Sequence, residues 1–263
     1  MTASQSRQQD AKRMIRAYWE GKPCGAKHAT APEGDPQYFA QIEKRRYELE
    51  PFIPQFADFE GSRDTRVLEI GVGLGTDFLR FARAGANMTG VDLTEHSVGL
   101  VTRRLELEGL EGDVRVADAE ALPFDDNSFD RIYSWGVLMV TPDTPRAINE
   151  AIRVLRPGGG VCAMVYSRRS WVALGLWGRY GLLVGKPWRS LADVIADHME
   201  SPGMKAYTEP EVRDLFKGLV DLQIEHVSTS YDLRVGGPLV HLTGSRLGWF
   251  MVVQGRKPGL RFE

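Results

Sequence analysis

The sequence predicts an α/β fold, in which helices cover both faces of a doubly wound, mostly parallel sheet. From residue 66 onward, short apolar runs alternate with stretches whose apolar residues recur at helical spacing. Directly after the first run, EIGVGLGTD at residues 69–77 places three glycines at alternate positions, which lets a strand turn sharply into a helix. Strands that alternate with crossover helices are typical of a parallel sheet.

Strands are expected where apolar and β-branched residues cluster between turn signals. The first run, RVLEI, has the pattern of a buried strand, and later runs repeat it. The expected strands are residues 66–70, 87–92, 113–118, 129–134 and 161–166, with two further strands within 222–233 and 248–255.

Helices are expected between these strands. Thr94 is the expected N-cap of the helix after the second strand, and Gly109 is its expected end. Farther along the chain, Thr208 followed by Glu211 has the pattern of a capping box. The expected helices of this part are residues 75–86, 94–109, 142–155 and 208–216.

Two regions depart from the alternation. Residues 11–60 predict N-terminal helices interrupted by a Gly/Pro-rich link, and residues 167–207 are rich in Trp and Arg. We expect the second region to be a lid that closes over a substrate and decides its identity. The expected parts are an N-terminal helical cap at 1–60, the core at 61–166, the inserted lid at 167–207 and the C-terminal part of the core sheet at 208–263.

The composition argues against several classes of protein. A formal net charge of −2 supplies no electrostatic footprint for nucleic acid. Cys24 and Cys162 lie far apart and the five histidines are scattered, so we expect neither a disulfide framework nor a metal. The polar N-terminus lacks the apolar core of a signal peptide, and no stretch reaches about 18 uninterrupted apolar residues. We therefore expect a cytoplasmic protein without a membrane span.

The three glycines suggest a ligand close to the backbone at the start of a helix, where an anionic or carboxylate-bearing group is favoured. Their spacing is G-x-G-x-G. A dinucleotide fingerprint, G-x-G-x-x-G, would need a glycine where Thr76 stands. Glycine-rich turns of this kind also occur as purely structural features, so the turn alone does not identify a ligand.

An acid at the end of the second strand adds to this pattern. The two oxygens of Asp92 can accept hydrogen bonds from the two hydroxyls of a ribose. The alternative is that Asp92 caps the next helix, a role for which Thr94 competes. The sequence thus favours a ligand with an unphosphorylated ribose.

The stretch from 66 to 166 carries four ordered motifs: LEIGVGLGTD, GVDLTEHSV, DAEALPFDDNSFDRIYSWGVL and VLRPGGG. In these motifs it resembles the class I S-adenosylmethionine-dependent methyltransferases, specifically their small-molecule group. The resemblance implies a seven-stranded Rossmann-like sheet and S-adenosyl-L-methionine as cofactor. It also implies methyl transfer to a small molecule, such as a natural-product intermediate, by in-line displacement.

The resemblance also assigns site residues. In that family the glycine loop passes under the methionine moiety, and acids after strands two and three hold the ribose and the adenine amino group. Here Asp92 would bind the ribose and Asp118, otherwise a turn residue, would accept from adenine, while Ala119 offers its N–H and Leu93 packs on the ring. The other residues expected at the cofactor are Glu69, Gly71, Gly73, Gly75, Asp77, Ser134 and Trp135, with Tyr47 from the N-terminal helices.

The methyl acceptor is harder to predict. Many relatives carry a His pair after strand four, where this chain has Met139 and Val140. An acid–base residue then comes from elsewhere, or the nucleophile loses no proton in the transition state. We expect Tyr166 and Arg168 to be catalytic, because strand five leaves the sheet there, beside the ligand crevice. Their region suits an acceptor with an apolar body and an anionic handle, or else is an amphipathic cap.

Two other functions stay open. An NAD-dependent oxidoreductase is disfavoured by the missing final glycine and by the strand-three acid. A non-catalytic S-adenosylmethionine-binding protein is compatible with Met139 and Val140. Nucleic-acid methylation is not expected, because SWGV stands where an N-P-P-Y-type tetrad would follow strand four. The expected partner is a small molecule, and the oligomeric state is not predicted.

Overall fold

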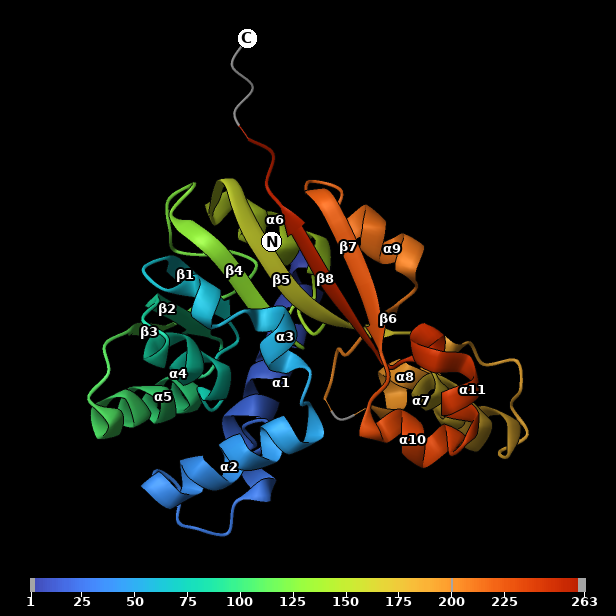
Figure 1. Ribbon diagram of the computed structural model, residues 1–263. Coiled ribbons are helices and arrows are strands. Elements are labelled where there is room, and N and C mark those ends of the chain that lie inside the picture. The colour runs from blue at the N-terminus through green and yellow to red at the C-terminus, as the bar shows by residue number, and fades with distance from the viewer. Residues whose placement is uncertain (1–2, 200, 260–263) are drawn as a thin grey trace.

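The computed structural model describes residues 3–199 and 201–259, which fold around one mixed sheet (Figure 1). Its strand order is β3-β2-β1-β4-β5-β8-β7, with the short β6 paired to the end of β5. Strands β1 to β5 are parallel, while β8 runs antiparallel to both β5 and β7. The strands are β1 Arg66–Ile70, β2 Asn87–Asp92, β3 Asp113–Val116, β4 Phe129–Trp135, β5 Leu155–Ser167, β6 Ala206–Tyr207, β7 Val220–Val227 and β8 Phe250–Arg256.

The predicted doubly wound α/β fold is confirmed, because the strands alternate with helices that cover both faces of the sheet (Figure 1). Thr94 accepts a hydrogen bond from the N–H of Ser97, and Gly109 ends the helix in the left-handed conformation, as expected. The helices are α1 Ala3–Gly21, α2 Pro36–Leu49, α3 Ile53–Ala57, α4 Thr76–Arg83, α5 Glu95–Glu108, α6 Thr144–Val154, α7 Trp171–Trp177, α8 Leu191–His198, α9 Glu209–Leu215, α10 Ser230–Gly236 and α11 Leu239–Thr243.

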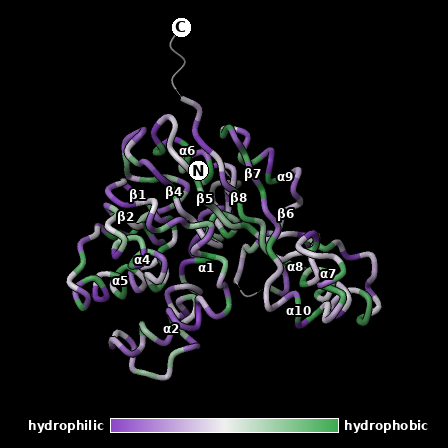
Figure 2. The backbone as a smooth tube through the Cα atoms, viewed as in Figure 1, coloured by the Kyte–Doolittle hydropathy of each residue, from purple (hydrophilic) through white to green (hydrophobic). Residues whose placement is uncertain are grey.

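The core lies along the central strands. Figure 2 shows hydrophobic residues along β4, β5 and β8, and the apolar side chains of β1 at Val67, Leu68 and Ile70 are almost completely buried. Strands covered on both faces need such continuous apolar runs. Because β1 to β5 are parallel, their carboxyl ends meet at one edge of the sheet, where α1 and α2 also lie (Figure 1).

One strand prediction was wrong in part. The strand expected within 222–233 ends at Val227, and α10 begins at Ser230. Thr229 and Asp232 form a capping box in which the Asp232 carboxylate accepts from the Thr229 N–H at 2.8 Å and from its hydroxyl at 2.9 Å. Because this capping box begins a helix, the strand ends before it, although apolar residues follow in the sequence.

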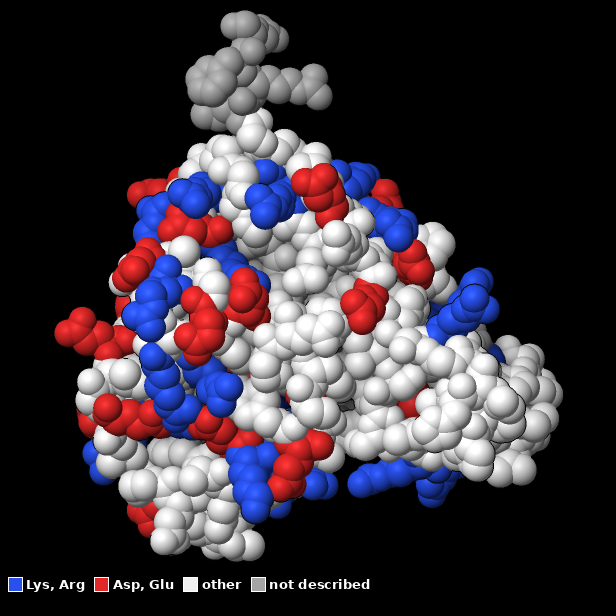
Figure 3. Space-filling model, viewed as in Figure 1, with Lys and Arg blue, Asp and Glu red and all other residues white. Residues whose placement is uncertain are grey.

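A helical lobe, made of α7, α8, α10, α11 and the π-helical turn Gly178–Leu182, lies beside the sheet edge (Figure 1). It comes from two insertions, one after β5 and one between β7 and β8, and α7 packs against both α8 and α10. Only the first insertion was predicted from the sequence. Figure 3 shows that the lobe carries few charged residues on this face, whereas Lys, Arg, Asp and Glu are interspersed over the other half. Closure of residues 167–207 stays a prediction.

None of the helices in the described residues is both long and apolar enough to cross a membrane.

Candidate active site

A pocket of about 280 Å³ opens at the carboxyl edge of the parallel strands. Strand ends β1 to β5 supply one wall, and α1, α2 and the link between them face it. The pocket gathers ten of the residues that the sequence analysis expected at the site: Glu69, Gly71, Gly73, Asp77, Asp92, Leu93, Asp118, Ala119, Trp135 and Tyr166. Ligands of open α/β sheets bind at such an edge.

The glycine turn connects β1 to α4 in a conformation that side chains rarely adopt. Gly71, Gly73 and Gly75 have φ angles of 85°, 51° and 71°. A Cβ on Gly71 would lie 2.2 Å from a methyl group of Val137, so this glycine is needed for packing. A Cβ on Gly73 would meet no atom within 4 Å, because this glycine borders the pocket. The turn thus offers bare backbone to a ligand at Gly73.

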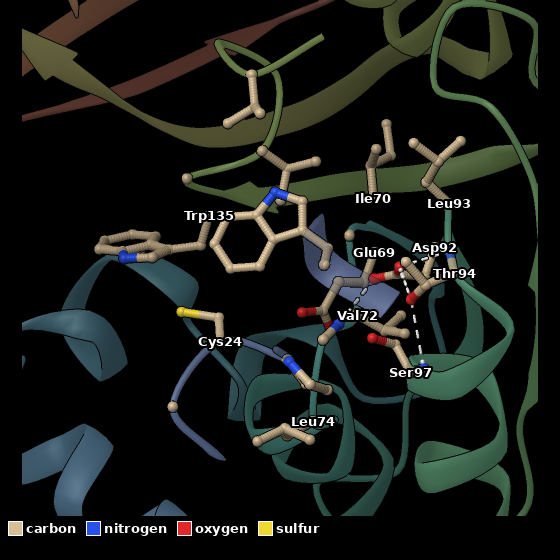
Figure 4. A pocket seen from close by; sticks show the side chains of 18 of the residues that line it. Cys24, Glu69, Ile70, Val72, Leu74, Asp92, Leu93, Thr94, Ser97 and Trp135 are labelled. Carbon is tan, nitrogen blue, oxygen red and sulfur yellow. Dashed lines mark hydrogen bonds between the residues drawn. The ribbon is translucent and has the colours of Figure 1, made fainter. Parts of the chain in front are cut away.

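Asp92 is held in place at the end of β2. Its Oδ2 accepts from the N–H of Gly73 at 3.1 Å, and its Oδ1 accepts from the N–H and hydroxyl of Thr94 at 3.0 and 2.7 Å. Figure 4 shows Asp92, Thr94 and Glu69 grouped on one side of the pocket, with Cys24 across from them. Thr94 caps α5, so Asp92 is not needed as the cap. Burial raises the pKa of Asp92, while these hydrogen bonds counteract that rise.

A buried polar cluster joins α2 to the start of α4. Asp77 accepts hydrogen bonds from Arg46 at 2.7 Å, from the hydroxyl of Tyr47 at 3.0 Å and from that of Tyr133 at 2.9 Å. Its side chain is only 3% exposed. Burial alone disfavours a carboxylate, and three donors, one of them cationic, offset that cost. Asp77 therefore orients Arg46 at the pocket wall.

Glu69, at the end of β1, is an acid of the site with an unsatisfied atom. Its Oε2 is buried and has no hydrogen-bond partner among the described residues. Burial, together with the nearby Asp77, raises the pKa of Glu69 well above its usual range. A buried acceptor in a ligand pocket is explained by a donor that a ligand brings, and an ammonium group has that chemistry.

Glu50, which the sequence analysis did not identify, also lines the pocket. Its Oε2 accepts from the indole N–H of Trp135 at 2.8 Å and lies 3.5 Å from Arg46. Burial raises the pKa of Glu50, and Arg46 counteracts the rise. Glu50 is the C-cap of α2, where the helix dipole gives no reason for an acid. An acid at this end of a helix was the only feature of the sequence that could have drawn attention to Glu50.

Asp118 and Ala119 also line the pocket. Lys12 of α1 contacts both Asp118 Oδ2 and Glu120 Oε2 at 2.5 Å. Asp118 Oδ1 also accepts from the N–H of Glu120 at 2.9 Å, as a turn acid would. Lys12 was not predicted, because nothing in the sequence relates residue 12 to a strand end more than 100 residues away.

An aromatic chamber lies where β5 and β8 border the pocket. Tyr166 stacks on Trp249 with ring centroids 4.4 Å apart, and it also contacts Phe250. Tyr231 of α10 lines the same pocket, so the second insertion contributes to it as well. Val140 lines the pocket with an apolar side chain, as expected from the missing His pair, whereas Met139 is packed in the core. The chamber suits an apolar group.

Four expected site residues lie outside the pocket lining. Gly75 is the N-cap of α4, where a Cβ would lie 2.9 Å from Val101. The Ser134 hydroxyl donates to the carbonyl of Ile70 within the sheet, and Tyr47 reaches the site only through Asp77. Arg168 turns toward β6 and α9, donating to the Ala206 carbonyl at 3.1 Å and pairing with Glu211 at 3.1 Å. These four are Gly75, Ser134, Tyr47 and Arg168.

In the part of the chain that the structure describes, no three His, Cys, Asp or Glu side chains are grouped so that they could hold a metal ion.

Residues 67–159 match a family model described as a methyltransferase domain. The chain is 35% identical over 156 residues to an uncharacterized protein of Mycobacterium tuberculosis, covering 59% of this chain and 54% of that protein. Over 96 residues it is 44% identical to the phthiotriol/phenolphthiotriol dimycocerosates methyltransferase of Mycobacterium leprae, covering 36% and 35%. The chain thus spans about half the length, or less, of these curated relatives.

Solved structures agree on the fold over almost the whole chain. The cyclase SpnF superposes with a TM-score of 0.57 at 18% identity, covering 98% of this chain and 97% of SpnF. At that identity the likeness shows the fold alone. The matched family model and the strand order agree that residues 67–159 form a methyltransferase domain.

Proposed function

We propose that the protein transfers a methyl group from S-adenosyl-L-methionine to a small-molecule acceptor. The observation that carries the proposal is that one pocket joins the glycine turn and the strand-end acids to an aromatic chamber. The first part suits the cofactor, and the second offers space for an acceptor beside it. A single pocket with both features brings donor and acceptor together.

The residues present fit this cofactor. Gly73 leaves space above the backbone, and Asp92 retains unused acceptor capacity for ribose hydroxyls. The buried Oε2 of Glu69 receives no hydrogen bond from the described residues, and the ammonium group of a methionine moiety would supply one. Asp118 and Ala119 would receive the adenine, with Leu93 against its face. Lys12 would then share Asp118 with the adenine amino group, because each carboxylate oxygen can accept more than one hydrogen bond.

Methyl transfer requires little of the protein beyond alignment of the acceptor with the methyl group. When bound, the cofactor supplies an electrophilic methyl group on a sulfonium. This chain's residues would hold the acceptor in line and exclude water, for which the apolar walls at Val140, Met164 and Phe250 are suited. If the acceptor loses a proton, Glu50 is the group we propose to receive it, because its carboxylate lines the pocket and burial raises its pKa.

The acceptor is proposed to be predominantly apolar. Tyr166, Tyr231 and Phe250 border the chamber, and a relative with 44% identity over the core is named for dimycocerosates, although it covers little of this chain. Mass spectrometry of a metabolite extract incubated with the protein and methyl-labelled cofactor tests the proposal directly. A labelled small molecule is expected. Binding of cofactor without any labelled product would favour the non-catalytic alternative, and binding of NAD instead would favour an oxidoreductase.

Replacing Asp92 with alanine is expected to weaken binding of S-adenosylhomocysteine by about 2 kcal/mol, or about thirtyfold, because hydrogen bonds to a charged group are lost. Titration calorimetry measures the change. The matched control is Asp113→Ala, which removes an exposed acid from the neighbouring strand β3. Thermal melting without ligand checks that the glycine turn survives. Unchanged affinity in folded Asp92→Ala would remove this acid from the cofactor site.

Replacing Tyr166 with alanine is expected to lower turnover of the identified acceptor at least about tenfold, while cofactor affinity stays within about twofold, because its ring borders the acceptor chamber. Arg168→Ala is the control, since Arg168 contacts Glu211 and β6 instead of the pocket. Steady-state kinetics with calorimetry separate the two effects. Normal turnover in Tyr166→Ala, or an equal loss in Arg168→Ala, would contradict this assignment.

A further inference from the structure

The helical lobe ends in an exposed apolar loop. Every residue from 182 to 188, LLVGKPW, is exposed, and Leu183 and Trp188 reach 82% and 77% exposure. Single exposed apolar side chains are ordinary on protein surfaces, but a contiguous run of this kind marks an interaction site. The loop begins at Leu182, the last residue of the π-helical turn, and precedes α8.

The second insertion adds apolar surface to the same lobe. Leu239 and Leu242 of α11 are 52% and 82% exposed, and Leu233 and Val235 of α10 are also exposed. Since α10 packs on α7, both insertions present their apolar residues from one compact unit. Figure 3 shows this unit as a nearly uncharged bulge with Lys and Arg at its lower margin.

The charges along residues 168–189 have one sign, whereas α8, which follows them, carries the exposed acids Asp193 and Asp197. Residues 168–189 contain four arginines and one lysine but no Asp or Glu. Two of the arginines, Arg168 and Arg189, pair with acids. Five other cations in and next to the lobe have no ion-pair partner in the described residues: Arg169, Arg179, Lys186, Arg234 and Arg246. An apolar surface bordered by unpaired cations is complementary to a surface of phosphate groups above hydrocarbon.

We propose that the lobe docks on an anionic lipid bilayer. Leu183 and Trp188 would enter the boundary between headgroups and acyl chains, where an indole is favoured, while Arg179 and Lys186 would meet lipid phosphates. The protein does not span the membrane in this arrangement; it lies on it. The excess of Lys and Arg over acids on this surface favours an anionic bilayer over a folded protein partner.

Docking would place the pocket next to the lipid. Tyr231 of α10 lines the pocket, so the lobe that contacts the bilayer also borders the aromatic chamber. An apolar acceptor dissolved in the membrane would then reach the chamber without crossing much water. The docking itself does not rest on methyl transfer, because lipid binding is measured without cofactor or acceptor.

The test is sedimentation of the full chain with vesicles of phosphatidylcholine alone and of phosphatidylcholine mixed equally with phosphatidylglycerol. The protein is expected to sediment with the mixed vesicles only. Leu183→Ser combined with Trp188→Ser is expected to weaken this binding about tenfold or more, and Arg179→Ala combined with Lys186→Ala should weaken it about tenfold and reduce its salt dependence. Val220→Ser, an exposed apolar position on β7 outside the lobe, is the control and should not alter binding.

Three outcomes would overturn the proposal. Absence of sedimentation with anionic vesicles excludes the bilayer as the partner. Equal binding by the lobe variants and the control shows that another surface binds lipid. A stable dimer in analytical ultracentrifugation that Leu183→Ser dissociates, together with no vesicle binding, assigns the surface to a second copy of the chain. Because the substituted side chains are exposed, thermal melting should be unchanged in every variant.

Discussion

Replacing Arg46 with methionine is expected to destabilise the folded protein by about 3–5 kcal/mol, since it leaves buried carboxylates without their cation. Arg46 contacts Asp77 at 2.7 Å and Glu50 at 3.5 Å, and Glu69 lies in the same cluster. Methionine retains much of the side-chain volume, so lost packing contributes little. Tyr47 and Tyr133 still donate to Asp77, but neutral hydroxyls do not compensate two carboxylates.

Urea unfolding measures the effect of Arg46→Met. The matched control is Arg45→Met on the same helix, where the arginine is 40% exposed and pairs with Glu48 on the surface. The control should change stability by less than about 1 kcal/mol, because surface ion pairs contribute little. If Arg46→Met lowers the free energy of unfolding by no more than this, the buried carboxylates of the cluster must become protonated or hydrated at little cost. The ion pair of Arg46 with Asp77 would then not be what holds α2 against the start of α4.

Replacing Gly73 with valine is expected to abolish measurable cofactor binding, a loss of at least about a hundredfold, while the chain stays folded. A Cβ at this position meets no protein atom within 4 Å, so the valine side chain would stand in the space assigned to the cofactor. The backbone strain at φ 51° costs about 1–2 kcal/mol, which a stable domain tolerates. The effect on binding should therefore exceed the effect on stability.

A second glycine separates these two effects. Gly109, the C-cap of α5, has φ 64° and also has no atom within 4 Å of a built Cβ, but it is not in the pocket lining. Gly109→Val should therefore cost similar stability and leave binding of S-adenosylhomocysteine unchanged in calorimetry. If Gly73→Val still binds with near-normal affinity, or if both variants lose binding equally, the glycine turn does not hold the cofactor.

Much of the fold could be predicted from short-range pattern. The alternation of apolar runs and capping residues such as Thr94 and Gly109 is local, so it located strands and helices well. The second insertion escaped prediction because the segment after Val227 keeps an apolar pattern that suits a strand or a helix. Only the side-chain hydrogen bonds of Asp232 decide for the helix.

Site residues at the ends of strands were predicted from the sequence. Site residues that reach the pocket from elements distant in sequence were missed. Asp92 is the last residue of β2 and Asp118 comes shortly after β3, and both line the pocket. Glu50 and Lys12 reach it from helices whose docking no local pattern specifies. Arg168 also follows a strand, but its side chain leaves toward Glu211, because a strand end fixes where a residue lies and not where its side chain points.

The position of β8 within the sheet has a consequence for how the chain is made. Although β8 comes after β7 in sequence, it lies between β5 and β7, so β7 has no neighbour in the sheet until residues 250–256 have left the ribosome. Until then the long β5 presents an unpaired edge, the kind of surface at which nascent chains associate wrongly. The half of the sheet that carries the glycine turn can pair as it emerges, because β1 to β5 are neighbours without β8. During synthesis, the part of the sheet from β1 to β5 can therefore form first, whereas β7 can join the sheet only after β8 has emerged.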